Sequence, residues 1–320
     1  MIREEHMKHF ASGAAMALVL ATPAFAQDDT KVIGVSIPAA THGWAGGMNY
    51  FAQAAIDRLS ETYPNLQFVL ATASDPAKQV NDIEDMVATR NIDALVVLPF
   101  ESEPLTGPVQ NVKQSGAWVT VVDRGLSVEG IQDLYVAGDN PGFGRVSGEY
   151  MVEAMPDGGN IVVLRGIPTS IDNERVEGFE AAIEGSGIEV LGMEHGNWNR
   201  DDSFTVMQDF LQRHPQIDAV WASDDDMAMG VLGAIEASGR DDVQFVLGGA
   251  GMKEMIKRTM DGDAMIPANV TYPPSMIATA IEITAVGLVS QAPVSGEFII
   301  GSVLVTPDNA ETYYYPDSPF

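Results

Sequence analysis

The sequence predicts an α/β protein of two similar lobes, each a doubly wound parallel sheet, with a cleft between them. Short runs rich in Val, Ile and Leu alternate with longer amphipathic segments along most of the chain. This alternation is typical of parallel strands covered by helices on both faces. It comes in two successive series, and 320 residues suffice for two domains of ordinary size.

The first series begins just after residue 30. A helix is expected at 76–90, where apolar residues recur at helical spacing. Asp75 is suited to be its N-cap, and Pro76 is tolerated in its first turn. The strands expected in this series are 32–38, 67–73, 94–100 and 118–124.

The segment "DLYVAGDN" at 133–140 is expected to begin the second series. The strands expected there are 161–165, 189–194, 219–223 and 244–249, and the helices are 171–184, 203–213, 226–238 and 252–260. After "AMIPANVTYPP" at 264–274, a helix at 275–290 and a strand at 298–305 remain. Two lobes of this kind bind ligands at the carboxyl ends of their strands, in the crevice between them.

The N-terminus has the features of a secretory signal peptide, residues 1–26. A basic start precedes an apolar stretch that ends in Ala24-Phe25-Ala26, a cleavage signal of the A-x-A type. The apolar stretch, 11–20, is too short for the roughly 20 residues of a spanning helix. Two glutamates in "MIREEH" favour Met7 over Met1 as the start of translation. We therefore expect a periplasmic protein that does not insert in the membrane.

Composition excludes several classes of function. The formal charge of −28 argues against nucleic acid and anionic lipid as partners. The chain has no cysteine, which excludes disulfides, thiolate metal sites and a cysteine nucleophile. No nucleophile elbow, phosphate-binding loop or zinc-protease motif is present. We therefore expect neither an enzyme nor a cofactor.

Charged and aromatic residues follow several of the expected strands. Asp123 and Arg124 are adjacent opposite charges, suited to grip hydroxyl groups; an ordinary loop with a capping aspartate and a surface arginine is the alternative. Trp44 and Trp198 lie in expected loops, and each could pack on a sugar ring or cover a domain core. Arg175 opposes the dipole of its expected helix, so a surface carboxylate or a ligand should compensate its charge.

The run Asp224–Asp226 raises the question of a metal site. Capping of the helix expected from about Asp226 explains one of these carboxylates better. Only His42, His195 and His214 lie beyond the signal peptide, and the chain has no cysteine, so we expect no metal.

Four features together resemble a known family. They are "VVDRG" at 121–125, "ERVEGF" at 174–179, "WASDDDMAMG" at 221–230, and the strand followed by an aromatic residue near the start. Together they are similar to the ribose-binding-protein-like periplasmic substrate-binding proteins of ABC sugar transporters, which have the type I periplasmic-binding fold. The resemblance covers the chain after the signal peptide. Effector domains of LacI-type repressors share this fold but carry a helix-turn-helix where this chain has the signal peptide.

The resemblance implies the ligand-binding residues. Those on the first lobe are His42, Trp44, Asp123 and Arg124, and those on the second are Arg175, Trp198 and Asp224. At two further positions ribose binders have aspartate and glutamine, whereas this chain has Ala250 and Tyr272. This exchange predicts a ligand whose end facing the second lobe is branched or carries fewer hydroxyls. An ordinary aldose met by Tyr272, or by a water beside Ala250, is the alternative.

The resemblance also implies how the chain is divided. The N-terminal lobe would hold 27–137 plus 273–300, and the C-terminal lobe 138–272 plus 301–320. Three crossovers near 137–138, 271–273 and 300–302 would join them. Trp44 would then be covered by the ligand, and by the second lobe on closure.

The implied function is a monomeric periplasmic receptor that captures a monosaccharide or small polyol by hinge closure. It would deliver this ligand to the permease of an ABC importer. A sensor that presents the sugar to a chemoreceptor or histidine kinase is the alternative, and a sugar-modifying enzyme is the third reading.

Overall fold

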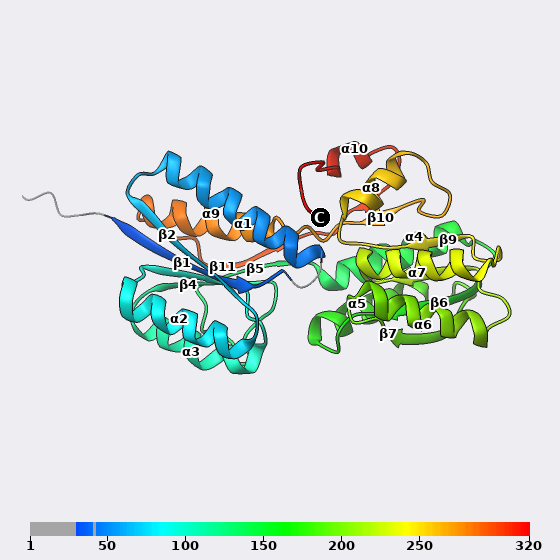
Figure 1. Ribbon diagram of the computed structural model, residues 1–320, viewed down its shortest axis with the longest axis horizontal. Helices are drawn as coiled ribbons and strands as arrows, with labels where there is room; N and C mark the ends of the chain where they lie inside the picture. Colours follow the sequence, from blue (N-terminus) through cyan, green and yellow to red (C-terminus); the bar gives the residue numbers. More distant parts are fainter. Residues whose placement is uncertain (1–29, 41–42) are drawn as a thin grey trace, which may run out of the picture.

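The computed structural model describes residues 30–40 and 43–320, so the predicted signal peptide and His42 lie outside the described residues. Two parallel sheets lie side by side along the long axis of the molecule (Figure 1). We call the six-stranded sheet and its helices the first lobe, and the four-stranded sheet and its helices the second lobe. The predicted fold class, α/β with two parallel-sheet lobes, is confirmed.

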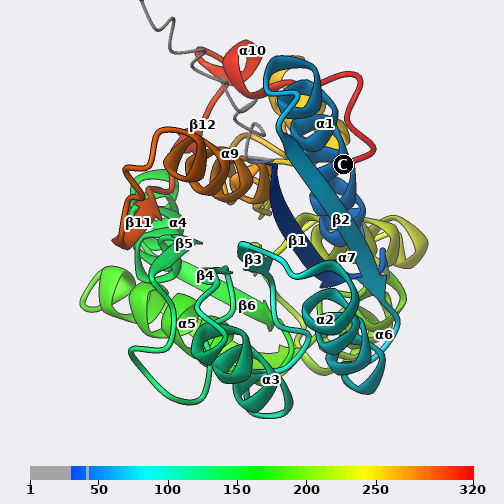
Figure 2. The same ribbon diagram turned by 90° about the vertical axis from the view of Figure 1, so that its left-hand side faces the viewer.

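The first lobe has the strand order β11-β5-β4-β3-β1-β2, with all pairs parallel. Helices α1 and α9 cover one face of this sheet and α2 and α3 the other (Figures 1 and 2). The strands are β1 (Lys31–Pro38), β2 (Leu66–Ala73), β3 (Ala94–Val97), β4 (Trp118–Val122), β5 (Leu134–Gly138) and β11 (Gly296–Ile300). The helices are α1 (Gly43–Thr62), α2 (Pro76–Arg90), α3 (Ser102–Gln114) and α9 (Met276–Val289).

The second lobe has the strand order β7-β6-β8-β9, again with all pairs parallel. Helix α4 packs against α5, and α6 packs against α7. The strands are β6 (Gly159–Arg165), β7 (Ile188–His195), β8 (Ala219–Ala222) and β9 (Phe245–Leu247). The helices are α4 (Asn140–Ala154), α5 (Ser170–Ile183), α6 (Arg200–Arg213), α7 (Asp225–Ser238) and α8 (Lys253–Met260).

Two expectations about the strands were wrong. The segment 133–140 does not begin the second series, because β5 pairs with β4 and β11 in the first lobe. The strand expected at 298–305 is two elements: β11, and β12 (Leu304–Val305), which pairs antiparallel with β10 (Asn269–Val270). Both errors concern strand pairing, which the local sequence does not reveal.

The helix expected at 76–90 is confirmed as α2. Its N-cap is Asp75, whose carboxylate accepts a hydrogen bond of 2.8 Å from the amide of Lys78. Helix α7 begins at Asp225 rather than Asp226, with Asp224 as its N-cap. Within residues 30–40 and 43–320, no helix combines the length and the apolar character needed to cross a bilayer.

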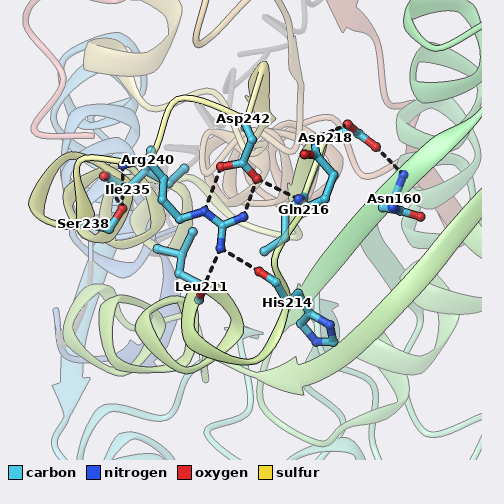
Figure 3. A network of polar contacts seen from close by, with 10 residues as sticks. Asn160, Leu211, His214, Gln216, Asp218, Ile235, Ser238, Arg240 and Asp242 are labelled. Atoms are coloured by element: carbon cyan, nitrogen blue, oxygen red, sulfur yellow. Dashed lines mark hydrogen bonds and ion pairs between the residues drawn. The ribbon is translucent and has the colours of Figure 1, made fainter.

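A network of polar contacts lies at the amino ends of β8 and β9 in the second lobe (Figure 3). The guanidinium of Arg240 forms an ion pair with Asp242 and donates hydrogen bonds of 2.6 Å to the carbonyl oxygens of Leu211 and His214. Asp242 also accepts a hydrogen bond of 2.8 Å from the amide of Ile217. The Arg240 contact lowers the pKa of Asp242 to about 2. The network thus joins the end of α6 to the segment between α7 and β9.

Candidate ligand-binding site

A cavity of about 640 Å³ lies between the two lobes. This volume is in the range typical of small-molecule sites, roughly 300–1,000 Å³. Its walls come from segments that follow strands of both sheets, where ligands of open α/β folds bind. Eight predicted site residues line it: Trp44, Asp123, Arg124, Arg175, Trp198, Asp224, Ala250 and Tyr272. The structure therefore brings together every predicted site residue that it describes; their role in binding stays a prediction.

Asp123 follows β4 in a strained backbone conformation. Its φ is 59°, in the left-handed region that non-glycine residues seldom adopt. Two main-chain hydrogen bonds hold it there: its amide donates to the oxygen of Val136 at 2.9 Å, and its carbonyl accepts from the hydroxyl of Tyr135 at 2.5 Å. Its side chain is buried, and Oδ1 accepts a hydrogen bond of 2.6 Å from the hydroxyl of Tyr272. Strain of this kind is concentrated at functional sites.

Arg124 is half-buried beside Asp123. Its Nη1 donates to the carbonyl oxygen of Phe100, in the loop after β3. Its Nε is buried and has no hydrogen-bond partner among the described residues. A buried donor without a partner costs free energy, and Arg124 lines the cavity, so a ligand acceptor that reached this nitrogen would remove that cost.

Arg175 lies on α5 and is only 4% exposed. Its Nε donates to Oδ1 of Asn140 at 2.9 Å, and its Nη1 to the carbonyl oxygen of Ser223 at 2.8 Å. The guanidinium carbon also lies 4.2 Å from the ring centroid of Tyr272 and 4.5 Å from that of Phe143. Carbonyl, amide and aromatic groups thus surround the charge that was expected to face a surface carboxylate or a ligand.

Trp44 does not lie in a loop, as the sequence suggested, but in the first turn of α1. The amide of Gly43 donates to Oδ2 of Asp226, 183 positions further along the chain, at 2.8 Å. The indole Nε1 of Trp44 donates to the carbonyl oxygen of Tyr272 at 2.9 Å. Trp44 is therefore partly covered by Tyr272 of the protein itself.

Trp198 lies in the loop between β7 and α6. Its φ is 51° and that of Asn197 is 56°, two successive residues in the left-handed region. A side chain at Gly166 would come within 2.1 Å of the indole, so only glycine allows this approach. Nε1 of Trp198 is buried without a hydrogen-bond partner among the described residues. It is the second donor on the cavity wall that no described group satisfies.

The three aspartates that follow β8, Asp224–Asp226, make different contacts. Asp224 caps α7 and lines the cavity, and its pKa is raised to about 7, mainly by burial and then by the charge of Asp226. Asp225 is buried and accepts hydrogen bonds from the amides of Gly251 and Met252 and from Asn269. Among the residues that the structure describes, no group of three or more His, Asp or Glu side chains could hold a metal ion.

Ala250 and Tyr272, the two positions that differ from ribose binders, both line the cavity. Ala250 has a φ of 94°, strained for a residue with a Cβ, and its amide donates to Val270 at 2.8 Å. Tyr272 is only 2% exposed. Burial, followed by the charge of Asp123, raises the pKa of Tyr272 well above its usual value. The hydroxyl of Tyr272, which in the alternative interpretation would meet a ligand hydroxyl, donates to Oδ1 of Asp123 at 2.6 Å.

Two segments that line the cavity were not predicted from the sequence. They are 101–104, before and at the start of α3, and 167–171, before and at the start of α5. Both lie in connections that lead from the carboxyl end of a strand to the next helix, and this position was the signal that could have identified them. The positioning residue Asn140 was also missed, because its contact with Arg175 joins residues 35 positions apart.

Residues 33–288 match the family described as periplasmic binding protein domain. The chain belongs to this family. The ribose import binding protein RbsB of Escherichia coli is 31% identical over 195 residues, which are 61% of this chain and 65% of that protein. The chain thus aligns with slightly less than two thirds of that relative. The D-apiose import binding protein of Paraburkholderia graminis is 26% identical over 85% of both chains.

Solved structures of periplasmic binding proteins have the same fold. An ABC transporter solute-binding protein from Bacillus halodurans, with bound myo-inositol, is 26% identical with a TM-score of 0.79. The match covers 89% of this chain and 97% of that one. The resemblance drawn from the sequence motifs is therefore confirmed.

Proposed function

We propose that this protein is a periplasmic receptor that captures a monosaccharide or small polyol and delivers it to an ABC importer. The observation that carries the proposal is the mixture of groups on the cavity wall. Arg124 and Trp198 each present a buried donor without a described partner, whereas Asp123 presents a carboxylate. A hydroxyl group both donates and accepts, so a polyhydroxylated ligand satisfies both kinds of group. The wall also includes Trp44 and Trp198, whose rings suit the C–H face of a sugar.

Transport is favoured over sensing. The related proteins from Escherichia coli and Paraburkholderia graminis are import binding proteins for ribose and D-apiose. The alternative, presentation of the sugar to a chemoreceptor or histidine kinase, receives no support from these relatives. The proposed task is binding and release without catalysis, by a monomer whose partner is the importer permease.

We expect the ligand to close the two lobes about the predicted crossovers near 137–138, 271–273 and 300–302. The proposed lobes remain 27–137 plus 273–300 and 138–272 plus 301–320. Backbone contacts at these places support this division: the amide of Asp139 donates to Ile300 at 2.9 Å, and that of Thr271 to Val303 at 3.0 Å. Short connections of this kind suit hinge closure. Small-angle scattering should show a smaller radius of gyration at saturating ligand; an unchanged profile would contradict closure.

The proposed location follows from the predicted signal peptide. We expect the mature protein to begin near Gln27 and to be found in the periplasm. Periplasmic location is implied by the family, and N-terminal sequencing of protein from the native cell tests the cleavage site. An intact N-terminus on cytoplasmic material would refute this part of the proposal.

A thermal-shift screen tests the proposed function directly. The panel should hold pentoses, hexoses, deoxysugars, branched sugars and alditols, each with the purified mature protein. A true ligand at a hundredfold excess over its Kd adds about 2.7 kcal/mol to the free energy of unfolding. No shift with any member of the panel would count against the proposal, and turnover of a bound sugar would favour an enzyme.

A further inference from the structure

One of the two carboxylate oxygens of Asp123 already accepts a hydrogen bond from within the protein. Oδ1 accepts the hydroxyl of Tyr272 at 2.6 Å, and none of the described residues donates to Oδ2. A carboxylate with two available oxygens can accept hydrogen bonds from two neighbouring hydroxyls of a sugar. In this cavity the phenol stands where one of those hydroxyls would lie.

The ring of Tyr272 is fixed by packing on several sides, so its hydroxyl stays at Asp123 unless these contacts are lost. The guanidinium of Arg175 lies over its ring, and the rings of Phe143 and Trp44 have centroids at 6.2 and 6.0 Å. The indole of Trp44 also donates to the Tyr272 carbonyl at 2.9 Å. On the remaining side, a Cβ at Gly138 would lie 2.1 Å from the ring, so the chain carries glycine where the phenol is seated.

The residue beside Tyr272 on this wall does not replace the lost acceptor; the other buried carboxylate on the cavity, Asp224, already caps α7 through Oδ1. Ala250, which also lines the cavity, contributes a methyl group and is 3% exposed. Among the described residues that line the cavity, the buried side-chain atoms without a hydrogen-bond partner are Nε of Arg124 and Nε1 of Trp198, and both are donors. A ligand hydroxyl directed at the Tyr272–Ala250 wall therefore meets one acceptor fewer than the carboxylate alone would provide.

We propose that Tyr272 acts as a built-in substitute for a ligand hydroxyl at Asp123, and so selects sugars or polyols that lack one hydroxyl at that end. Deoxysugars, branched sugars and short alditols are the chemical class that fits. This inference rests on the proposed function. It assigns Tyr272 a part in specificity through Asp123, and Asp123 remains the group that contacts the ligand.

The test compares wild type with Tyr272→Phe, which removes one oxygen and keeps the ring. The matched control is Tyr135→Phe, since Tyr135 donates to the main-chain oxygen of the same Asp123 at 2.5 Å. Calorimetry measures Kd for three pairs that differ by one hydroxyl: D-ribose and 2-deoxy-D-ribose, D-glucose and 2-deoxy-D-glucose, D-galactose and D-fucose. Circular dichroism checks that each variant is folded.

In wild type, we expect at least one deoxysugar to bind as tightly as its parent. In Tyr272→Phe, Oδ1 of Asp123 is free, and a site with an unpaired acceptor rejects the ligand that lacks the hydroxyl. The ratio of the Kd of the deoxysugar to that of the parent should therefore rise about tenfold or more for that pair. Tyr135→Phe should weaken the binding of both members of a pair alike and leave their ratio within about twofold of wild type, because its hydroxyl holds the main chain of Asp123 and does not contact the carboxylate.

Three results have distinct meanings. An unchanged ratio in Tyr272→Phe, as when a water takes the vacated position, overturns the inference and leaves the proposed function intact. An equal change in Tyr135→Phe also overturns it, because the effect would then be a general loosening of Asp123. Failure of wild type and both variants to bind any of the six sugars, or any member of the thermal-shift panel, refutes the proposed function itself.

Discussion

The carboxylate of Asp226, at the start of α7, accepts a hydrogen bond of 2.8 Å from the amide of Gly43, the first residue of α1. This contact joins the second lobe to the first beside the cavity. The other carboxylate oxygen of Asp226 accepts from Arg200 at 3.1 Å, within the second lobe. Because an amide at a helix N-terminus favours a negative partner, the contact stabilises the arrangement of the two lobes in this structure.

Asp226→Ala should weaken ligand binding. The variant loses the hydrogen bond between the lobes, a contribution of about 1–2 kcal/mol, so the Kd for the tightest sugar of the panel should rise roughly 5- to 30-fold. Small-angle scattering should also show a larger radius of gyration. Arg200→Ala is the matched control, because it removes only the partner within the second lobe. Equal Kd values for wild type and Asp226→Ala would contradict the role of this contact.

Asp123→Ala should abolish binding with little loss of fold. The change leaves the ligand hydroxyls and the hydroxyl of Tyr272 without an acceptor, at about 1–3 kcal/mol for each unpaired group. Calorimetry measures the loss. Asp133→Ala is the control on the same lobe, since Asp133 pairs with Lys113 and accepts from the amide of Val119 but does not line the cavity. Wild-type affinity in Asp123→Ala would show that Asp123 does not bind the ligand and has only a structural role in the loop after β4.

Asp224 should make the unliganded protein less stable as the pH rises. Its pKa is about 7 in the folded protein, above the ordinary value of 3.8. The stability associated with its neutral form is therefore complete below about pH 4 and is lost as the pH rises through 7. A shift of this size corresponds to at most about 4 kcal/mol.

The measurement is thermal unfolding at pH 5 and pH 8. Asp224→Asn keeps a good N-cap and should reduce the loss of stability between these two values. Asp242→Asn is the control: the pKa of Asp242 is lowered to about 2 by Arg240, so its contribution changes only below about pH 4, and this variant should keep the wild-type loss of stability between pH 5 and pH 8. A pH dependence of Asp224→Asn that equals that of wild type would be evidence against a raised pKa.

Ala250→Gly should stabilise the protein or leave its stability unchanged. The φ of 94° strains alanine, and such strain costs about 1–3 kcal/mol. Glycine removes the strain but adds conformational freedom to the unfolded chain, about 0.5–1 kcal/mol. Urea unfolding should show a net gain of about 0–2 kcal/mol. Ala234→Gly, in the interior of α7, should lower stability by comparison; a similar loss in both variants would mean that Ala250 is not strained.

Phe320→Ala should lower the free energy of unfolding of the protein. Phe320 is 3% exposed and lies against Gly43 and Gly47 of α1 and against Pro274. Removal of a buried aromatic ring costs about 3–5 kcal/mol in a rigid core, so we expect a loss of about 3 kcal/mol. Tyr315→Ala, which removes an exposed ring of the same tail, should change the free energy of unfolding by about 1 kcal/mol or less. A loss in Tyr315→Ala as large as in Phe320→Ala would contradict this prediction.

The sequence by itself determined the elements whose signals are local. Helix α2 was predicted with its bounds because Asp75, Pro76 and the apolar spacing all lie within or next to it. The parallel-sheet class followed from Val- and Ile-rich runs that are buried on both faces. Because cavity walls in such folds are made by the segments after strands, the same patterns located Asp123, Trp198 and Asp224 at strand ends.

Only the tertiary structure decided relationships between distant residues. The amide of the first residue of α1 donates to Asp226, 183 positions away, and Oδ1 of Asp123 accepts the hydroxyl of Tyr272, 149 positions away. The pKa of Asp224 depends on burial and on Arg175, which reaches it from α5. Hydrogen bonds and electrostatic shifts depend on distance in space, and local sequence patterns carry no information on which side chains the fold brings together.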